Sequence, residues 1–312
     1  MSEQTLELTG LDGSNPLAFL AALGTLRALT RAWPDQPVRM SWTQSAGWHP
    51  MLATRFGPDD VIEALHSEVR SATVHPTLTV ADDLTLDGPS FRRHLRTQVD
   101  AACNEESTSN TGPTEYAAAF GCDAICDERS GRIADTALRT MSGAGHQHFL
   151  KTMRSVLQQT KAADLDKTLF QPWRYNDPLQ NLNLRFDPLD DKRYALRWDD
   201  PSGDPTRRTR GNMLGANALA VLGIPMLPTA PMSTRLETTG FRGHRSHDCY
   251  WTWPIWKCAI GCDTVCSLLA HGELQSDVPN RRLLSALGVA EIFRSQRITV
   301  GKFRNLTTAQ AV

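Results

Sequence analysis

We expect this chain to fold around one apolar segment near its N-terminus, Leu11-Asp-Gly-Ser-Asn-Pro-Leu-Ala-Phe-Leu-Ala-Ala-Leu-Gly-Thr-Leu-Arg27. Asn15 is a good helix N-cap, and Pro16 suits the first helical position, where its missing N–H costs nothing. The helix that follows is apolar almost all round, and Arg27 is its only charged residue up to Thr30. We therefore expect this helix to lie at the centre of the core.

The same helix carries a glycine in its middle. It is expected to end at about Trp33, because Pro34 follows. Gly24 lowers helix propensity by roughly 1 kcal/mol relative to alanine. A glycine at such a position suggests that another backbone approaches closely there.

The rest of the chain mixes helices and strands without strict alternation, which indicates an α+β fold with mixed helices and short antiparallel strands. Further helices are predicted over 58–70, 89–102, 146–162, 211–223, 262–271 and 281–289. Strands are predicted over 4–10, 38–42, 194–198 and 249–257, and an extended segment over 224–231. The C-terminal residues 290–306 are predicted to form a hairpin that turns at Val300-Gly301.

One segment has the composition of a loop. Residues 103–113 are polar and contain Gly-Pro, so they form a candidate flexible loop or boundary. They would separate an N-terminal part over 1–102 from a C-terminal part over 114–312. A single compact unit over the whole chain is the alternative.

Composition restricts the possible partners. The 312 residues include 33 basic and 34 acidic side chains, for a net charge of −1. Binding to nucleic acid would therefore need local basic clusters or assembly in a complex. The N-terminus has neither a basic start nor an apolar run, and no stretch of about 18 apolar residues occurs, so we expect no signal peptide and no membrane contact. The seven cysteines fit a reduced, cytoplasmic protein.

Motifs of common enzyme classes are missing from the sequence. It contains no phosphate-binding Gly-x-x-x-x-Gly-Lys-Ser/Thr, no Gly-x-Ser-x-Gly elbow and no His-Glu-x-x-His zinc helix. Its paired carboxylates, such as Asp82-Asp83, stand in turn-like contexts. We therefore expect no catalytic residue and no cofactor.

Cysteines and histidines gather towards the C-terminus. Cys258, Cys262 and Cys266 recur every four residues, and His247 and Cys249 lie just upstream. A zinc site could combine Cys249, His247 and one of the other three. Structural zinc sites prefer short Cys-x₂₋₄-Cys knuckles, however, and a helical cysteine stripe more often packs as small buried hydrophobes. We therefore expect no metal.

Local basic clusters are the candidate nucleic-acid contacts, since arginine and lysine supply most contacts to the phosphate backbone. One cluster begins the helix over 89–102, one lies in a Gly/Pro/Thr loop, and one spans the C-terminal region. Their residues are Arg92, Arg93 and Arg96; Arg207, Arg208, Arg210 and Asn212; and Arg281, Arg282, Arg294, Arg297, Lys302 and Arg304. The loop is the sharpest candidate, because it could wrap a phosphate with side chains and backbone N–H groups.

Tryptophans cluster around Pro254. Trp251 and Trp253 would share one face of a strand, and Trp256 follows closely. Core packing or a partner interface fits them better than base stacking. We take the three as the candidate apolar anchor of a partner interface.

The N-terminal segment resembles the opening of proteins encoded with CRISPR type I-G systems, formerly called I-U. More narrowly, the chain is similar to the large-subunit-like and helicase-extension proteins of that subtype. Further segments agree in order and spacing, and they span most of the chain: Gly145-His-Gln-His-Phe-Leu150, Phe186-Asp-Pro-Leu-Asp-Asp-Lys-Arg-Tyr-Ala-Leu196, Ala216-Asn-Ala-Leu-Ala-Val-Leu-Gly-Ile-Pro-Met-Leu-Pro-Thr229, Trp253-Pro-Ile-Trp256 and the C-terminal hairpin.

The resemblance implies a non-catalytic subunit of a crRNA-guided surveillance complex, with crRNA, target DNA, other effector subunits and a helicase-nuclease as partners. In such systems guide pairing reads the sequence, and protein reads a short flank and backbone shape. The chain is short for a large subunit, so PAM recognition and an accessory, bridging role are both open. The alternative function is a protein–protein scaffold of an antiviral complex without direct nucleic-acid contact.

Overall fold

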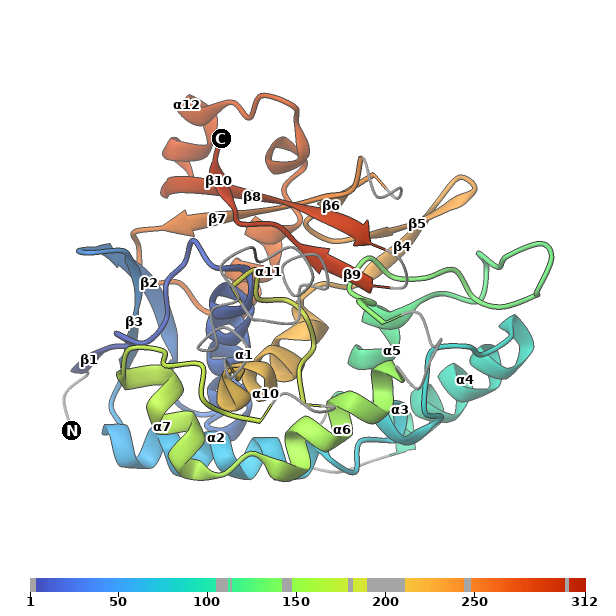
Figure 1. The fold of residues 1–312 in the computed structure, drawn as a ribbon, viewed down its shortest axis with the longest axis horizontal. Helices are drawn as coiled ribbons and strands as arrows, with labels where there is room; N and C mark the ends of the chain where they lie inside the picture. Colours follow the sequence, from blue (N-terminus) through green and yellow to red (C-terminus); the bar gives the residue numbers. More distant parts are fainter. Residues whose placement is uncertain are drawn as a thin grey trace, which may run out of the picture.

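The computed structural model has a mixed α+β fold, as predicted. It describes residues 4–104, 112, 114–141, 148–178, 182–189, 211–243, 248–300 and 303–312. An antiparallel sheet forms the upper layer in Figure 1, two crossing helices lie in the middle, and further helices close the bottom. None of the described helices combines the length and apolarity needed to span a membrane.

Helices and strands alternate irregularly along the described chain. The helices are α1 (Pro16–Ala32), α2 (Pro58–Ala72), α3 (Pro76–Thr79), α4 (Gly88–Asn104), α5 (Glu115–Phe120), α6 (Phe149–Gln159), α7 (Ala162–Phe170), α10 (Leu214–Gly223), η1 (Ile224–Met226), α11 (Cys262–Leu269), η2 (Gly272–Gln275) and α12 (Arg281–Ala286). The strands are β1 (Gln4–Glu7), β2 (Arg39–Gln44), β3 (Trp48–Thr54), β4 (Thr229–Met232), β5 (Arg235–Thr238), β6 (Phe241–Arg242), β7 (Tyr250–Trp256), β8 (Val289–Val300), β9 (Phe303–Leu306) and β10 (Gln310–Ala311).

Helix α1 begins as its sequence predicts. The Asn15 side chain accepts hydrogen bonds from the backbone N–H groups of Leu17 (2.8 Å) and Ala18 (3.2 Å), so it caps two of the unpaired donors of the first turn. Every residue from Pro16 to Leu29 is buried. The prediction of a central core helix is confirmed.

Gly24 marks the place where α1 crosses α10. A Cβ atom on Gly24 would lie 1.8 Å from the carbonyl oxygen of Leu219 and 2.9 Å from the backbone nitrogen of Gly223. Reciprocally, a Cβ on Gly223 would lie 2.5 Å from the carbonyl oxygen of Leu20. The predicted close approach of a second backbone is therefore confirmed, and that backbone belongs to another apolar helix.

The strands form antiparallel sheets. The largest has the order β10-β8-β7-β6, and β9 pairs with β8 as the C-terminal hairpin that the sequence predicts. A second sheet has the order β1-β3-β2, and β4 and β5 form a separate pair. The extended segment predicted over 224–231 begins as the 3₁₀ helix η1 before it enters β4. The strand predicted over 194–198 lies outside the described residues.

The tryptophans of β7 are core residues. Trp251 and Trp253 are 0% exposed and Trp256 is 1% exposed. The indole N–H of Trp253 donates to the carbonyl of Gly13 at 2.8 Å, and that of Trp256 donates to the carbonyl of Met40 at 2.7 Å. The prediction that these three rings form a partner interface is therefore wrong: β7 is covered on both faces, so the rings have no surface to offer.

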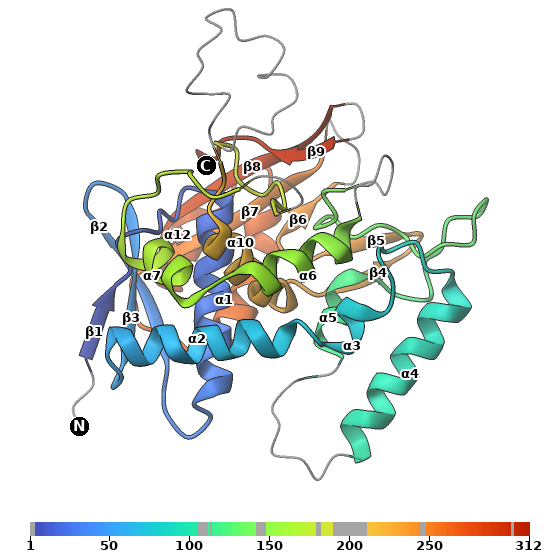
Figure 2. The same ribbon diagram turned by 60° about the horizontal axis from the view of Figure 1, so that its bottom comes forward.

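A continuous core joins the two halves of the chain. One cluster of buried apolar side chains runs from Leu8 to Leu306 and takes members from both sides of residues 103–113. A small second cluster of Phe91, Ala117 and Ile133 holds α4 to the body. Figure 2 shows α4 at the edge of the molecule, away from the central helices.

Candidate nucleic-acid interface

The C-terminal arginines support the fold and leave little charge for a ligand. Arg297 is 6% exposed and donates to the carbonyl of Arg139 at 2.9 Å. Burial lowers the pKa of Arg297 to about 10, with the neighbouring guanidinium of Arg304 acting in the same direction. A guanidinium that is covered by protein cannot contact a phosphate, so the prediction that Arg297 binds nucleic acid is wrong.

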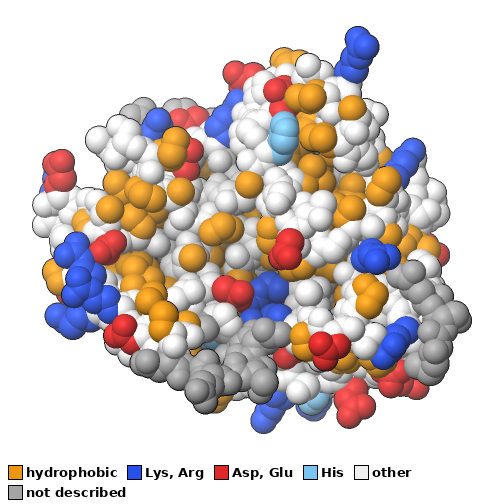
Figure 3. Space-filling view, turned by 180° about the vertical axis from the view of Figure 1, so that it is seen from behind, with side chains coloured by type: hydrophobic (Ala, Val, Ile, Leu, Met, Phe, Trp, Pro, Cys, Tyr) orange, Lys and Arg blue, Asp and Glu red, His pale blue; other side chains and the backbone are white. Residues whose placement is uncertain are grey.

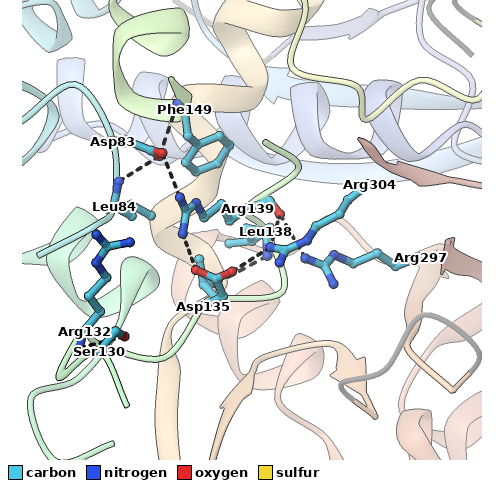
Figure 4. A network of polar contacts seen from close by, with 11 residues as sticks. Asp83, Leu84, Ser130, Arg132, Asp135, Leu138, Arg139, Phe149, Arg297 and Arg304 are labelled. Carbon is cyan, nitrogen blue, oxygen red and sulfur yellow. Dashed lines mark hydrogen bonds and ion pairs between the residues drawn. The ribbon is translucent and has the colours of Figure 1, made fainter. Parts of the chain in front are cut away.

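Arg304 belongs to a polar network that ties the β8–β9 hairpin to the loop before α6 (Figure 4). Its guanidinium lies 2.8 Å from the Asp135 carboxylate, which also binds Arg139. Arg139 extends the network to Asp83 at 2.7 Å, and both of these side chains are about 5–6% exposed. Asp83 in turn accepts from the backbone N–H of Leu84 at 2.9 Å. The paired carboxylates that the sequence places in turns therefore include one that neutralises a buried arginine.

Arg294 also has a structural role. Its guanidinium donates to the Thr252 hydroxyl at 2.9 Å and to the carbonyls of Ser276 (2.6 Å) and Asp277 (3.0 Å). These bonds fasten the loop after η2 to the sheet. Burial lowers the pKa of Arg294, and Arg242 adds to this effect.

The last two residues of this cluster begin helix α12. Arg281 forms an ion pair with Glu291 at 2.8 Å, and Arg282 is exposed. Arg281 lines a cavity of about 510 Å³ together with Lys257 and Cys258. Of the described residues of the C-terminal cluster, Arg281 and Arg282 are exposed and Arg294 and Arg304 are half-buried, whereas Lys302 lies outside the described residues.

Of the predicted loop cluster, only Asn212 lies among the described residues. Arg207, Arg208 and Arg210 lie outside the described residues. Asn212 is 1% exposed, and its side-chain amide donates to the carbonyls of Pro178 (2.9 Å) and Leu182 (2.8 Å). The prediction that Asn212 contacts nucleic acid is therefore wrong, because its amide holds two backbone segments together.

Helix α4 presents the remaining cluster to solvent. Arg92, Arg93 and Arg96 are exposed, while Phe91 on the same helix is buried in the small cluster. Arg92 lies 2.6 Å from Asp123, in an exposed pair that contributes at most about 1 kcal/mol. Arg93 donates to the Ser90 hydroxyl at 3.0 Å. We call the surface formed by Arg92, Arg93 and Arg96 the α4 face.

A neighbouring loop extends the α4 face with two arginines that the sequence analysis missed. The backbone N–H of Gly88 donates to the carbonyl of Gly131 at 3.1 Å, so the loop over 127–132 lies against the start of α4. Arg129 and Arg132 are exposed in this loop. The segment Asp127-Glu-Arg-Ser-Gly-Arg132 has two acidic and two basic residues and therefore no net charge. Its position beside α4 could not be inferred from it.

Two acidic side chains of this region, Asp87 and Asp127, accept hydrogen bonds within turns. Asp127 accepts from the backbone N–H (2.8 Å) and the hydroxyl (2.8 Å) of Ser130, and these bonds lower its pKa. Asp87 accepts from Ser90 in the same way, which lowers its pKa. Beside this loop, Arg132, Arg139 and Arg235 line a cavity of about 580 Å³. The surface in this region therefore carries both acidic and basic side chains, and the guanidinium groups of Arg129 and Arg132 are exposed on it.

The cysteines form no metal centre in the part of the chain that the structure describes. Helix α11 begins at Cys262, so Cys258 precedes it and the three cysteines do not share one helical stripe. Cys249 is buried, and burial raises the pKa of its thiol. Among the described residues no three His, Cys, Asp or Glu side chains are grouped to hold a metal ion. His247, which the zinc alternative needs, lies outside them.

No protein-family model matches the chain, and no curated protein matches it.

Proposed function

We propose that this chain is a non-catalytic subunit of a crRNA-guided CRISPR surveillance complex and that it contacts nucleic-acid backbone through the α4 face. The family resemblance of the sequence supports the first part. The second part is supported by the exposed guanidinium groups of α4 and of the adjoining loop, five side chains in all (Arg92, Arg93, Arg96, Arg129 and Arg132). They stand apart from the buried arginines that hold the C-terminal hairpin.

The single observation that carries the proposed contact is the division of the arginines into two groups. Arg139, Arg294 and Arg297 are held by carboxylates or carbonyls of the protein itself. The α4 arginines are exposed instead. The ion pair of Arg92 with Asp123 and the bond from Arg93 to Ser90 lie at the surface, where a phosphate can compete for the guanidinium groups. A protein with no overall excess charge needs such a local group if it is to bind a polyanion.

A charge-reversal variant tests this proposal. Arg92→Glu, Arg93→Glu and Arg96→Glu together should weaken binding of the assembled complex to crRNA or duplex DNA. They should also reduce the slope of log affinity against log salt by about 0.9 for each duplex phosphate that the protein no longer neutralises. The control is Arg55→Glu, Lys161→Glu and Lys257→Glu, which makes the same charge change at exposed positions elsewhere. An equal slope for both variants would overturn the α4 contact.

The scaffold alternative has a different surface in its favour. Leu283 and Leu287 at helix α12 are 44% and 50% exposed, and Val278 just before it is 84% exposed. Exposed apolar side chains in one region are typical of protein contacts. Leu283→Ser with Leu287→Ser should then abolish co-purification with the effector subunits while the α4 variant leaves it intact.

A further inference from the structure

A pocket of mixed polar and apolar lining lies at the C-terminal half of α1, where α2, α4, α5 and α10 meet. It has a volume of about 280 Å³. Its lining includes Arg27 and Arg31 of α1 together with His75, Gln98 and Tyr116. On the rear face of the molecule, basic side chains lie recessed with acidic side chains beside them (Figure 3).

Three buried polar atoms of this pocket have no hydrogen-bond partner. His75, Gln98 and Tyr116 are 9%, 5% and 3% exposed, yet the Nε2 atom of His75, the amide oxygen of Gln98 and the phenol oxygen of Tyr116 are unpaired. A buried polar group without a partner costs about 1–3 kcal/mol, so folded proteins rarely keep one unless it has a use. Three of them line this one cavity, where a ligand could supply the missing partners.

The charges of the pocket cancel. Arg27 forms an ion pair with Glu115, and Arg31 lies 3.3 Å from Glu68 and 3.4 Å from Glu115. His75 adds no charge near neutral pH, because burial and the nearby Arg27 and Arg31 lower its pKa to about 4. A strongly charged ligand therefore gains little electrostatic binding energy in this pocket, and a neutral ligand is at no disadvantage.

The side chains of the pocket include both hydrogen-bond donors and hydrogen-bond acceptors. The Nδ1 atom of His75 accepts from the backbone N–H of Thr77 at 3.2 Å, so the neutral imidazole carries its proton on Nε2 and can donate there. Tyr116 can donate or accept, and the amide oxygen of Gln98 accepts. The rings of His75 and Tyr116 pack edge to face with centroids 4.7 Å apart. The pocket thus offers both donors and an acceptor beside two flat aromatic rings.

We infer that this pocket binds a nucleobase, a neutral planar ring whose edge carries both hydrogen-bond donors and acceptors and whose faces stack on π systems. The base can belong to a free nucleotide or to a strand that the protein holds. This inference does not rest on the α4 contact, because its residues face inward and the α4 arginines face solvent.

The test uses the full chain with adenosine, guanosine, cytidine and uridine, and with short single-stranded RNA and DNA that are either intact or abasic. Binding is followed by calorimetry or ligand-observed NMR. Tyr116→Phe and Gln98→Met should each weaken binding about fivefold, the effect of one neutral hydrogen bond. The control Tyr250→Phe, on β7 and remote from the pocket, should change nothing. The melting temperature of the two pocket variants should equal or exceed that of the parent, since each loses an unpaired buried atom.

The outcomes distinguish a free nucleotide from a base within a strand. They also distinguish the nucleobase pocket from the proposed α4 contact. Binding of free nucleosides supports a soluble nucleotide as the ligand. Binding of intact but not abasic strands, weakened in both pocket variants, supports a base within a strand. Neither pocket variant should alter the salt slope, because neither removes a charge. If no nucleoside or strand loses affinity in either variant, the pocket holds water only and the inference is overturned.

Discussion

Replacing Gly24 by alanine should destabilise the protein, although alanine is the better helix former. The added Cβ would lie 1.8 Å from the carbonyl oxygen of Leu219, whereas ordinary contact begins at 3.4 Å. Both α1 and α10 are buried on all sides, so neither helix can move away without disturbing the layers above and below. The clash is with backbone, and no side-chain rotation can relieve it.

The magnitude follows from two opposing effects. Overpacking of a close-packed interior costs about 3 kcal/mol when backbone must shift. The better helix propensity of alanine returns about 1 kcal/mol. We therefore expect Gly24→Ala to lower the free energy of unfolding by about 2 kcal/mol.

Denaturant unfolding followed by far-ultraviolet circular dichroism measures this change. The matched control is Gly272→Ala, because Gly272 is exposed and a Cβ there would meet nothing within 4 Å. The control should be as stable as the parent or slightly more stable. If Gly24→Ala were also as stable as the parent, the close crossing of α1 and α10 at this glycine would be refuted.

Two further predictions concern the network around Arg139. Asp83→Asn should lower the free energy of unfolding by about 3 kcal/mol, since it removes one carboxylate from a buried guanidinium. The adjacent Asp82→Asn should cost less than about 1 kcal/mol because that side chain is 56% exposed, and equal losses in chemical denaturation would contradict the assignment. Burial opposes ionisation of Asp135, but Arg139 and Arg304 outweigh it and hold its pKa below the ordinary value. The stabilisation from Asp135 is therefore present above about pH 3.9 and is lost as pH falls through the lower folded-state pKa. Arg304→Gln should flatten the dependence of unfolding free energy on pH in that acidic range, and an unchanged pH profile would count against the pair.

Local signals in the sequence predicted much of the fold. The Asn15-Pro16 start of α1, the apolar helix after it and the crossing at Gly24 all follow from capping, periodicity and the absence of a side chain. These features depend on neighbours in the chain or on backbone sterics, which a sequence states directly. The C-terminal hairpin is confirmed for the same reason.

The sequence did not show which arginine and tryptophan side chains are buried and which are exposed. Arg297 and Arg96 look alike in a sequence, yet one donates to a buried carbonyl and the other lies in solvent. Trp253 has the same sequence pattern whether it anchors a partner or fills the core, and it fills the core. Burial of these side chains depends on which distant strand or loop covers them, and no local pattern specifies that.

Local sequence patterns specified the central helix, its cap, its close-packing glycine and the mixed α+β class. The role of each polar group depends on contacts that form only in the folded chain. The tertiary structure brought Asp83, Asp135 and Arg139 together, and it left Gln98 and Tyr116 unpaired in one pocket. The physical reason is that capping and periodicity act within a few residues, whereas charge pairing and burial arise between segments that meet only when the chain has folded.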